Sequence, residues 1–320
     1  MKLFDKVEVI YSIDDDINSL LKEIELNLDR LKLINKQKRD YLITKSILRS
    51  VHSSLSIEAN SLSLLEVLKI SQEKPVIGKQ KEIQEVKNTI EIYNDIKNYN
   101  YKSEEDFIKA YKVMMKSIIE DLGYRDHGEA VKKDDKIIYI APNHIFIPNL
   151  MKSLFEYLNK EDINLLTGAI FHYYLVAIHP FSDGNGRMAR FWMNLILTSY
   201  NKDFEFVPVE EEIYLNQEYY YKAIEESHIN GNVNVFIKFI LQMINDSLLK
   251  TIINNSFVPN DIQNKIIDLI TNNSKITQRE IAYITNVSER TIKRNFKILI
   301  DNKIIKRIGS DKTGSWEVLF

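Results

Sequence analysis

Twelve consecutive residues, His179 to Arg190, read HPFSDGNGRMAR and combine a histidine, an acid, two glycines and two arginines. Histidine is the side chain whose ordinary pKa lets it take a proton from a hydroxyl group at neutral pH. The Asp183 carboxylate is the kind of hard oxygen ligand that holds Mg²⁺ beside phosphates. Arg187 stands three residues before Arg190, and this spacing places both arginines on one helical face. A base, a metal ligand and two anion-binding groups indicate a nucleotide-dependent transferase.

This stretch lies between two apolar segments, 163–178 and 189–200, which we expect to be buried helices. Gly184 and Gly186 precede the second of them. The first amides of a helix have no intrahelical partner, and the helix dipole adds positive potential there. Because glycine lets a ligand approach the backbone closely, the start of the second helix is a predicted phosphate site.

Each feature taken singly has an ordinary explanation. A histidine at a helix end usually packs or caps, an Asp before a Gly usually caps a helix, and helical arginines usually face solvent. Their joint occurrence in twelve residues favours a functional site. The stretch also resembles the Fic signature, His-x-Phe-x-(Asp/Glu)-Gly-Asn-Gly-Arg-x-x-Arg, and it matches that signature at every fixed position.

The resemblance implies a protein adenylyltransferase, which transfers AMP from ATP to a Ser, Thr or Tyr hydroxyl of a protein target, with Mg²⁺ as cofactor. It implies that His179 is the general base, that Asp183 binds the metal and that Phe181 anchors the loop. It further implies that phosphates are bound by Gly184, Asn185, Gly186, Arg187 and Arg190, with Arg190 orienting the γ-phosphate.

Two further segments agree with this family. Residues 124–148 include the β-branched run KIIYIA, which predicts a β-hairpin with arms at 128–131 and 136–141 and a turn in KKDDK. In Fic proteins a hairpin at this place is the flap, so we expect the protein target to dock at 128–141 by strand addition. Tyr220 and Tyr221 resemble the family's Tyr-Tyr stretch beside the adenine pocket, although an aromatic pair on a helix is usually core.

The segment Ser54-Leu-Ser-Ile-Glu58-Ala59-Asn60 resembles the family's inhibitory motif, (Ser/Thr)-x-x-x-Glu-(Gly/Asn). It precedes the catalytic core, as in the class with an N-terminal inhibitory helix. The resemblance implies that Glu58 pairs with Arg190 and occupies the place of the γ-phosphate. The sequence departs from the motif at Ala59, and the alternative for Glu58 is a surface residue of an amphipathic helix.

Helical periodicity surrounds these motifs, and it predicts a mainly α fold with a Fic-type helical core. We expect helices within 15–70, a loop at 71–78, helices at 81–99 and at 104–122 with Gly123 as the C-cap, and further helices at 149–158, 218–227 and 233–249. The predicted domains are an N-terminal helical region with the inhibitory helix (1–75), the catalytic domain (76–250) and a C-terminal unit (259–320), with a linker at 251–258.

The C-terminal unit resembles a winged helix-turn-helix domain. We expect helices at 261–271, 277–285 and 288–302, a turn at Asn286, and a wing hairpin within 303–320 that turns at 310–314. Thr277 with Glu280 forms a capping-box pattern. Four cations on the third helix are candidates for DNA contact: Arg290, Lys293, Arg294 and Lys297. The alternative is a winged helix that binds protein.

Composition bounds these interpretations. The chain of 320 residues has no cysteine, which excludes disulfides, thiolate metal sites and thiol nucleophiles. The N-terminus has no signal-peptide core and no apolar run is long enough to span a bilayer, so we expect a cytoplasmic protein without membrane contact. The net charge is −2, yet residues 259–320 carry 11 Lys and Arg against 7 Asp and Glu. Self-association is left open.

Two other functions remain open from the sequence alone. One is a DNA-binding regulator whose Fic core senses a nucleotide. The other is the reverse reaction, in which Glu58 positions water to remove AMP from a modified target. Other nucleotides also remain open as donors, because a phosphate cradle does not recognise the base.

Overall fold

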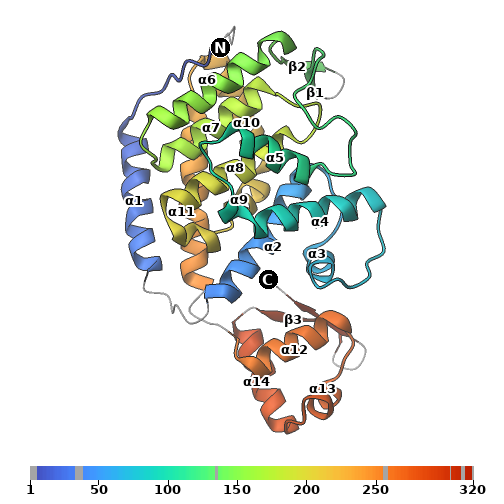
Figure 1. The fold of residues 1–320 in the computed structure, drawn as a ribbon. Helices are drawn as coiled ribbons and strands as arrows, with labels where there is room; N and C mark the ends of the chain where they lie inside the picture. The colour runs from blue at the N-terminus through green and yellow to red at the C-terminus, as the bar shows by residue number, and fades with distance from the viewer. Residues whose placement is uncertain are drawn as a thin grey trace.

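The computed structural model describes residues 6–32, 39–133, 136–254, 259–302, 304–310 and 314–318. The fold is mainly helical with two small antiparallel sheets, as the sequence predicts (Figure 1). The helices before the active-site loop are α1 (Asp15–Leu31), α2 (Arg39–Ile57), α3 (Leu64–Ser71), α4 (Gln80–Asn94), η2 (Ile96–Asn98), α5 (Glu104–Met114), η3 (His144–Phe146), α6 (Ile147–Lys160) and α7 (Leu165–Ile178). After the loop come α8 (Asn185–Tyr200), η4 (Lys202–Phe206), α9 (Val209–Leu215), α10 (Gln217–Asn230) and α11 (Asn234–Asn254).

Helices α7 and α8 form the centre of the larger helical body (Figure 1). Every residue of α7 except Val176 is buried, as expected for a helix that is apolar on nearly all sides. Asn164 caps its start: the Asn164 side chain accepts from the Thr167 amide, and the Thr167 side chain accepts from the Asn164 amide. The capping box therefore fixes where α7 begins.

The N-terminal helices belong to the same body. Helix α1 packs along α11, and α2 packs on α9, α4 and η4. A single cluster of buried apolar side chains runs from Val7 to Leu248 and includes residues on both sides of position 75. The boundary expected at 75/76 stays a prediction.

The helix expected at 104–122 is shorter than predicted, which is a correction. Helix α5 ends at Met114, and Ser117 has a positive φ of 60°. The Asn88 side-chain amide, from α4, donates to the carbonyls of Met114 and Lys116 at 3.1 and 2.8 Å. Because a side chain from another helix binds these carbonyls, the helix stops there, and Gly123 is not its C-cap.

The linker expected at 251–258 also begins later than predicted. Helix α11 continues to Asn254, and Thr251 is buried. Residues 255–258 lie outside the described part of the chain. Helix α9 and the short helix η4 were not among the predicted elements.

The C-terminal unit has a second apolar core, from Ile266 to Ile305, as a separate domain requires. It contains α12 (Asp261–Asn272), α13 (Gln278–Thr285), α14 (Glu289–Asp301) and the antiparallel strands β3 (Ile305–Ile308) and β4 (Ser315–Val318). The Thr277–Glu280 capping box is present, and Asn286 adopts the left-handed conformation at the turn. Most of the expected wing turn, at 311–313, lies outside the described residues.

The expected flap is a hairpin of β1 (Ala130–Lys133) and β2 (Lys136–Ile140), with Ala130 opposite Ile140. Its turn residues, 134 and 135, lie outside the described residues. Within the described ranges, none of the helices has the length and apolar character needed to cross a bilayer.

Candidate active site

His179 follows the last residue of α7 and turns the chain into the loop. Its φ of 53° lies in the left-handed region, which is uncommon for a residue with a side chain. Its Nδ1 is buried and makes no hydrogen bond to any described residue. Burial lowers the pKa of His179 below its ordinary value of 6.5, while the nearby backbone carbonyl of Val176 and then the carboxylates of Glu129 and Glu58 act in the opposite direction. The imidazole is therefore neutral at pH 7, the form that can accept a proton.

Arg125 holds this turn in place, and no pattern in the sequence indicates this role. Its side chain is buried and donates to three backbone carbonyls: that of His179 at 2.8 Å, that of Pro142 at 2.7 Å and that of His127. The Arg125 amide also donates to the carbonyl of Pro180 at 2.9 Å. One side chain thus joins the histidine turn to the segments on both sides of the hairpin.

Aromatic packing and one asparagine fix the loop itself. Phe181 is fully buried and stacks on the ring of Tyr111. The Asn185 side chain accepts from the amide of Phe181 and donates to its carbonyl, at 2.9 and 2.7 Å. The structure places Phe181 in the core, as expected for an anchor, and it gives the Asn185 side chain a positioning contact within the loop.

The start of α8 leaves its first amides without a side-chain cap. Gly184 is its N-cap, with φ of 84°. The Glu58 carboxylate lies directly over this turn, because a Cβ atom placed on Gly186 would come within 2.5 Å of Glu58 Oε1. The Glu58 carboxylate thus lies against the backbone of Gly186, and a side chain at this position would collide with it.

Arg190 reaches the same carboxylate from inside the core. Arg190 has no exposed surface, and its guanidinium donates to Glu58 Oε1 at 2.6 Å. It also donates to the hydroxyl and the carbonyl of Ser54, each at 3.0 Å. The Glu58–Arg190 contact predicted from the motif is therefore present, and Ser54 of the same motif completes it.

Arg187 is buried as well and pairs with two carboxylates, Asp183 at 2.8 Å and Glu85 at 3.3 Å. Its Nε is buried without a partner among the described residues. An unpaired donor beside the start of α8 suits an additional phosphate oxygen. Glu85, from α4, is a second residue of the site that the sequence did not indicate.

Asp183 is the one predicted metal ligand. Its Oδ1 accepts from Arg187 and from the Gly184 amide, whereas none of the described residues hydrogen-bonds to Oδ2, and the side chain is 42% exposed. The described residues contain no group of three or more His, Cys, Asp or Glu that could hold a metal ion. A single free carboxylate oxygen fits Mg²⁺, which commonly binds one or two carboxylates together with substrate phosphates.

The two tyrosines predicted beside the adenine pocket have different environments. Tyr220 is buried, and its hydroxyl forms a hydrogen bond of 2.9 Å with Nε2 of His172. Tyr221 is 48% exposed, and its hydroxyl lies 3.5 Å from the carbonyl of Ile57. Tyr221 is therefore the one whose ring is open to a ligand, and the nucleotide role of both residues stays a prediction.

The backbone conformation at Ala59 explains why the family's motif has Gly or Asn at this position. Helix α2 ends at Ile57, and Ala59 has φ of 63°. A residue with a Cβ is strained in this left-handed conformation by about 1–2 kcal/mol. Ala59 therefore adopts the left-handed conformation that the end of α2 needs, and its Cβ makes this conformation strained.

We predict that Ala59→Gly stabilises the folded protein by about 0.5–1 kcal/mol, because relief of the strain exceeds the extra entropy of glycine in the unfolded chain. Urea unfolding measures the change. Gly231 also has a positive φ, of 68°, so Gly231→Ala should destabilise the protein and serves as the reverse control. A less stable Ala59→Gly variant would contradict the strain.

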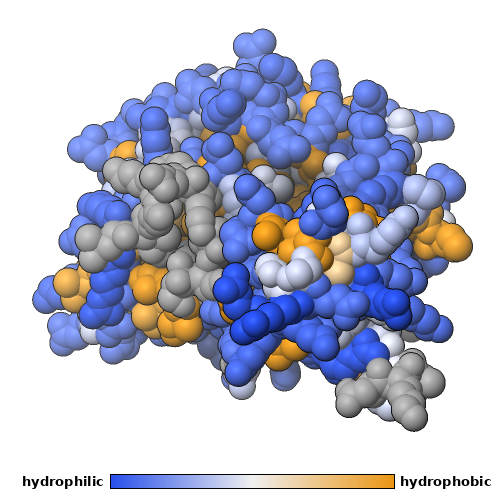
Figure 2. All heavy atoms as spheres, turned by 90° about the horizontal axis from the view of Figure 1, so that it is seen from below, coloured by the Kyte–Doolittle hydropathy of each residue, from blue (hydrophilic) through white to orange (hydrophobic). Residues whose placement is uncertain are grey.

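The four cations of the C-terminal unit lie on α14. Arg290, Lys293, Arg294 and Lys297 are all exposed, and none of them forms an ion pair with a described residue. The surface of this end of the molecule is largely hydrophilic (Figure 2). The only ion pair recorded on α14 joins Glu289 to Arg279. The predicted helix therefore presents its cations to solvent.

Comparisons with known proteins bear on both units. Residues 101–197 match the Fic/DOC family, and residues 259–306 match the family described as winged helix-turn-helix DNA-binding. The chain is 27% identical over 202 residues to a protein adenylyltransferase fic-1 of Caenorhabditis briggsae, and 27% identical over 209 residues to a protein adenylyltransferase Fic of Culex quinquefasciatus. These matches cover 59% and 61% of this chain but only 38% and 40% of the relatives.

Solved structures agree in fold. A Fic family protein from Desulfovibrio desulfuricans superposes with a TM-score of 0.75 at 26% identity, over 98% of each chain. A fragment of Fic-1 from Caenorhabditis elegans superposes with a TM-score of 0.61 at 22% identity, over 73% of this chain and 71% of that one. The first match includes nearly the whole chain, so the order of helical core and winged helix has a precedent.

Proposed function

Because this chain contains a Fic domain followed by a winged helix, we propose that it is a protein adenylyltransferase that moves AMP from ATP to a hydroxyl side chain of a protein target. The observation that carries the proposal is the Glu58 carboxylate over Gly186, beside a neutral histidine. An anion site at a helix start next to a base is what transfer of a nucleotide to a hydroxyl needs.

The residues have distinct parts in this reaction. His179 takes the proton of the target hydroxyl, whose oxygen bonds to the α-phosphorus of ATP. The bond from that phosphorus to the bridging oxygen breaks, and pyrophosphate leaves. The amides at the start of α8, with Arg187 and Arg190, bind the phosphate oxygens. Mg²⁺, held by Asp183, would supply charge neutralisation of the phosphates.

The resting state is autoinhibited in this proposal. Glu58 binds the buried guanidinium of Arg190 at 2.6 Å. Arg190 can therefore orient the γ-phosphate of ATP only after the end of α2 has moved and Glu58 has left the guanidinium. The protein target docks at the flap, 128–141, whose strand edge can pair with an extended segment. The protein is cytoplasmic in this proposal, and its association state is not specified.

Intact mass spectrometry after incubation with Mg²⁺ and each nucleoside triphosphate tests the reaction. The Glu58→Gly protein should gain the mass of one AMP with ATP. A gain of one phosphate, or of another nucleotide, would replace the proposed donor or the proposed reaction. Loss of AMP from a modified target by the wild type would favour the reverse reaction.

DNA binding is the second candidate function, because four exposed cations that form no ion pair with a described residue lie on one helix of a winged-helix unit. We predict that the full chain binds random duplex DNA and that its affinity falls steeply with salt. Replacing Lys293 and Lys297 with Gln should reduce the salt slope by about 2. Fluorescence anisotropy across a salt series measures this. Binding that is insensitive to salt, or absent, would leave the winged helix as a protein-binding unit.

A further inference from the structure

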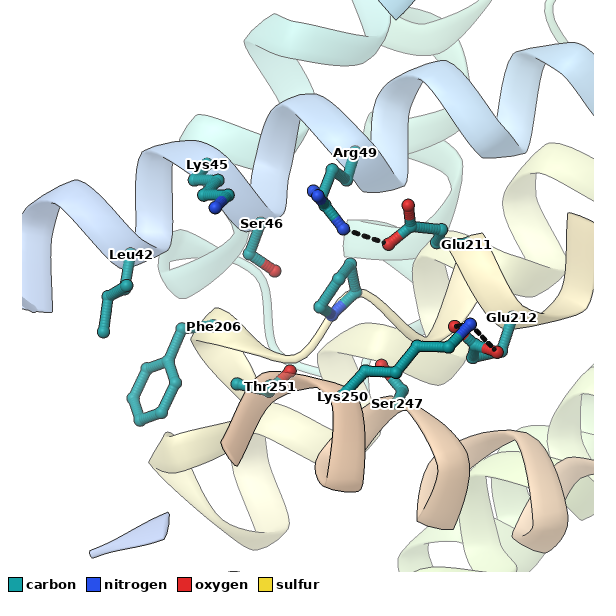
Figure 3. A pocket seen from close by; sticks show the side chains of 11 residues that line it. Leu42, Lys45, Ser46, Arg49, Phe206, Glu211, Glu212, Ser247, Lys250 and Thr251 are labelled. Atoms are coloured by element: carbon teal, nitrogen blue, oxygen red, sulfur yellow. Dashed lines mark hydrogen bonds and ion pairs between the residues drawn. The ribbon is translucent and has the colours of Figure 1, made fainter. Parts of the chain in front are cut away.

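A small cavity lies away from the active site, between the N-terminal half of α2 and the end of α11. Its volume is about 40 Å³, and α9 with the segment before it closes the third side. Figure 3 shows side chains of α2, α9 and α11 around it. Lys45, Ser46 and Arg49 come from one face of α2, and Ser247 and Thr251 come from one face of α11.

The hydroxyl groups around this cavity have no hydrogen-bond partner among the described residues. Ser46, Ser247 and Thr251 are buried, yet none of them hydrogen-bonds to a described residue. Helical Ser and Thr side chains commonly bond back to a carbonyl four residues earlier, as Thr271 does here to Ile267 at 2.8 Å. The absence of such bonds at all three positions leaves three donors for something inside the cavity.

Two of the three cations around the cavity form ion pairs with described residues, and the third does not. Arg49 pairs with Glu211 at 2.7 Å, and Lys250 pairs with Glu212 at 2.6 Å, so both carboxylates are already neutralised (Figure 3). Lys45 has no ion pair with a described residue, and the Nε of Arg49 is buried without a partner. Burial, and then Arg49, lower the pKa of Lys45 to about 8. An anion beside Lys45 would stabilise the charged form of this side chain and raise its pKa again.

We propose that this cavity is a binding site for a tetrahedral oxyanion, a phosphate ion or the phosphoryl end of a small monoester, held by Lys45 and the three hydroxyls. These four side chains line a space that would otherwise hold about three waters. A doubly charged oxyanion accepts several charge-assisted hydrogen bonds at once, which water cannot.

Binding here would also act on Glu58, because Glu58 directly follows the last residue of α2, the helix that carries Lys45, Ser46 and Arg49. Ser46 and Glu58 are separated by twelve residues of α2 and its end, or roughly 18 Å. An anion that joins α2 to α11 should hold α2 in the position where Glu58 meets Arg190. This consequence rests on the proposed function, whereas binding itself does not.

Thermal unfolding and calorimetry with sodium phosphate, against sodium chloride at equal ionic strength, test the site. Phosphate should stabilise the wild type, and Lys45→Met should weaken binding at this site tenfold or more. Without phosphate, Lys45→Met should be at least as stable as the wild type, since an unpaired half-buried cation is gone. The pair Ser247→Ala, Thr251→Val should weaken binding several-fold and covers the case in which Lys45→Met fails to fold.

Two controls separate this site from the active-site loop. The exposed Lys87→Met should behave as the wild type, and Arg187→Gln, which removes a donor at the start of α8, should keep the Lys45-dependent binding. A titration with phenyl phosphate shows whether a monoester or only the free ion fits, and either result supports the site. No stabilisation beyond chloride, or equal stabilisation of Lys45→Met and wild type, would overturn the proposal.

Discussion

Glu58→Gly is expected to raise the rate of AMP transfer by about 10²-fold, the size of effect seen when one preorganised charge contact in a transition state is gained or lost. The substitution removes the carboxylate over Gly186 and frees the Arg190 guanidinium, which Glu58 now binds at 2.6 Å. Initial rates with labelled ATP, for self-labelling, measure the change.

The same variant should be less stable without nucleotide. Arg190 has no exposed surface, whereas the Glu58 side chain is 35% exposed, so removing this carboxylate leaves one buried donor without its partner and should cost about 1–3 kcal/mol of stability. ATP supplies a new anion for this guanidinium, so ATP with Mg²⁺ should raise the melting temperature more in Glu58→Gly than in the wild type. If Glu58 were only a surface residue, the variant would not be both less stable without nucleotide and more strongly stabilised by ATP than the wild type.

Glu58→Gln is the matched control, because it keeps the side-chain length and loses the charge. It should activate less than Glu58→Gly. If neither variant is faster than the wild type, Glu58 has no inhibitory role, and the Glu58–Arg190 pair only holds α2 against α8.

The active-site loop was predictable because its chemistry is local in the chain. Helix, histidine, glycine turn and helix follow one another within residues 163–200, so apolar periodicity and helix-end physics place them together. The Glu58–Arg190 contact spans 132 positions, and only the resemblance to a known motif indicated it. No period or propensity in the sequence links two helices so far apart.

Arg125 and Glu85 were missed for a physical reason. Arg125 binds three backbone carbonyls, and any residue supplies a carbonyl, so the partners leave no pattern in the sequence. The end of α5 at Met114 was missed in the same way. The side chain that stops the helix, Asn88, belongs to α4, and such tertiary contacts override local helix propensity.

These misses bear on how the site works. In the proposed reaction, residues that the motif names would supply the base, the metal ligand and the phosphate contacts, while residues outside the motif fix their geometry. Arg125 joins the His179 turn to the segments beside the hairpin, so the hairpin and the proposed base are held by one side chain. If the target docks at the hairpin as proposed, its position and the proton acceptor are linked through the backbone.

His179→Ala in the Glu58→Gly background is expected to reduce AMP transfer by about 10²–10⁴-fold, the usual contribution of a general base. The folded protein should persist, because His179 lies at a helix end and its Nδ1 makes no hydrogen bond to a described residue. His144→Ala, a histidine outside the loop, is the matched control and should retain full activity. Labelling that survives His179→Ala would falsify the base assignment.

The pH dependence gives a second, independent test of His179. A general base works only when neutral, and burial lowers the pKa of this histidine below 6.5. The kcat/KM of Glu58→Gly should therefore be flat at neutral pH and fall in acid, with a midpoint below 6.5. Glu58 acts to raise this pKa, so its removal shifts the midpoint further down rather than up. A midpoint above 6.5 would contradict the lowered pKa of this buried histidine and, with it, the base assignment.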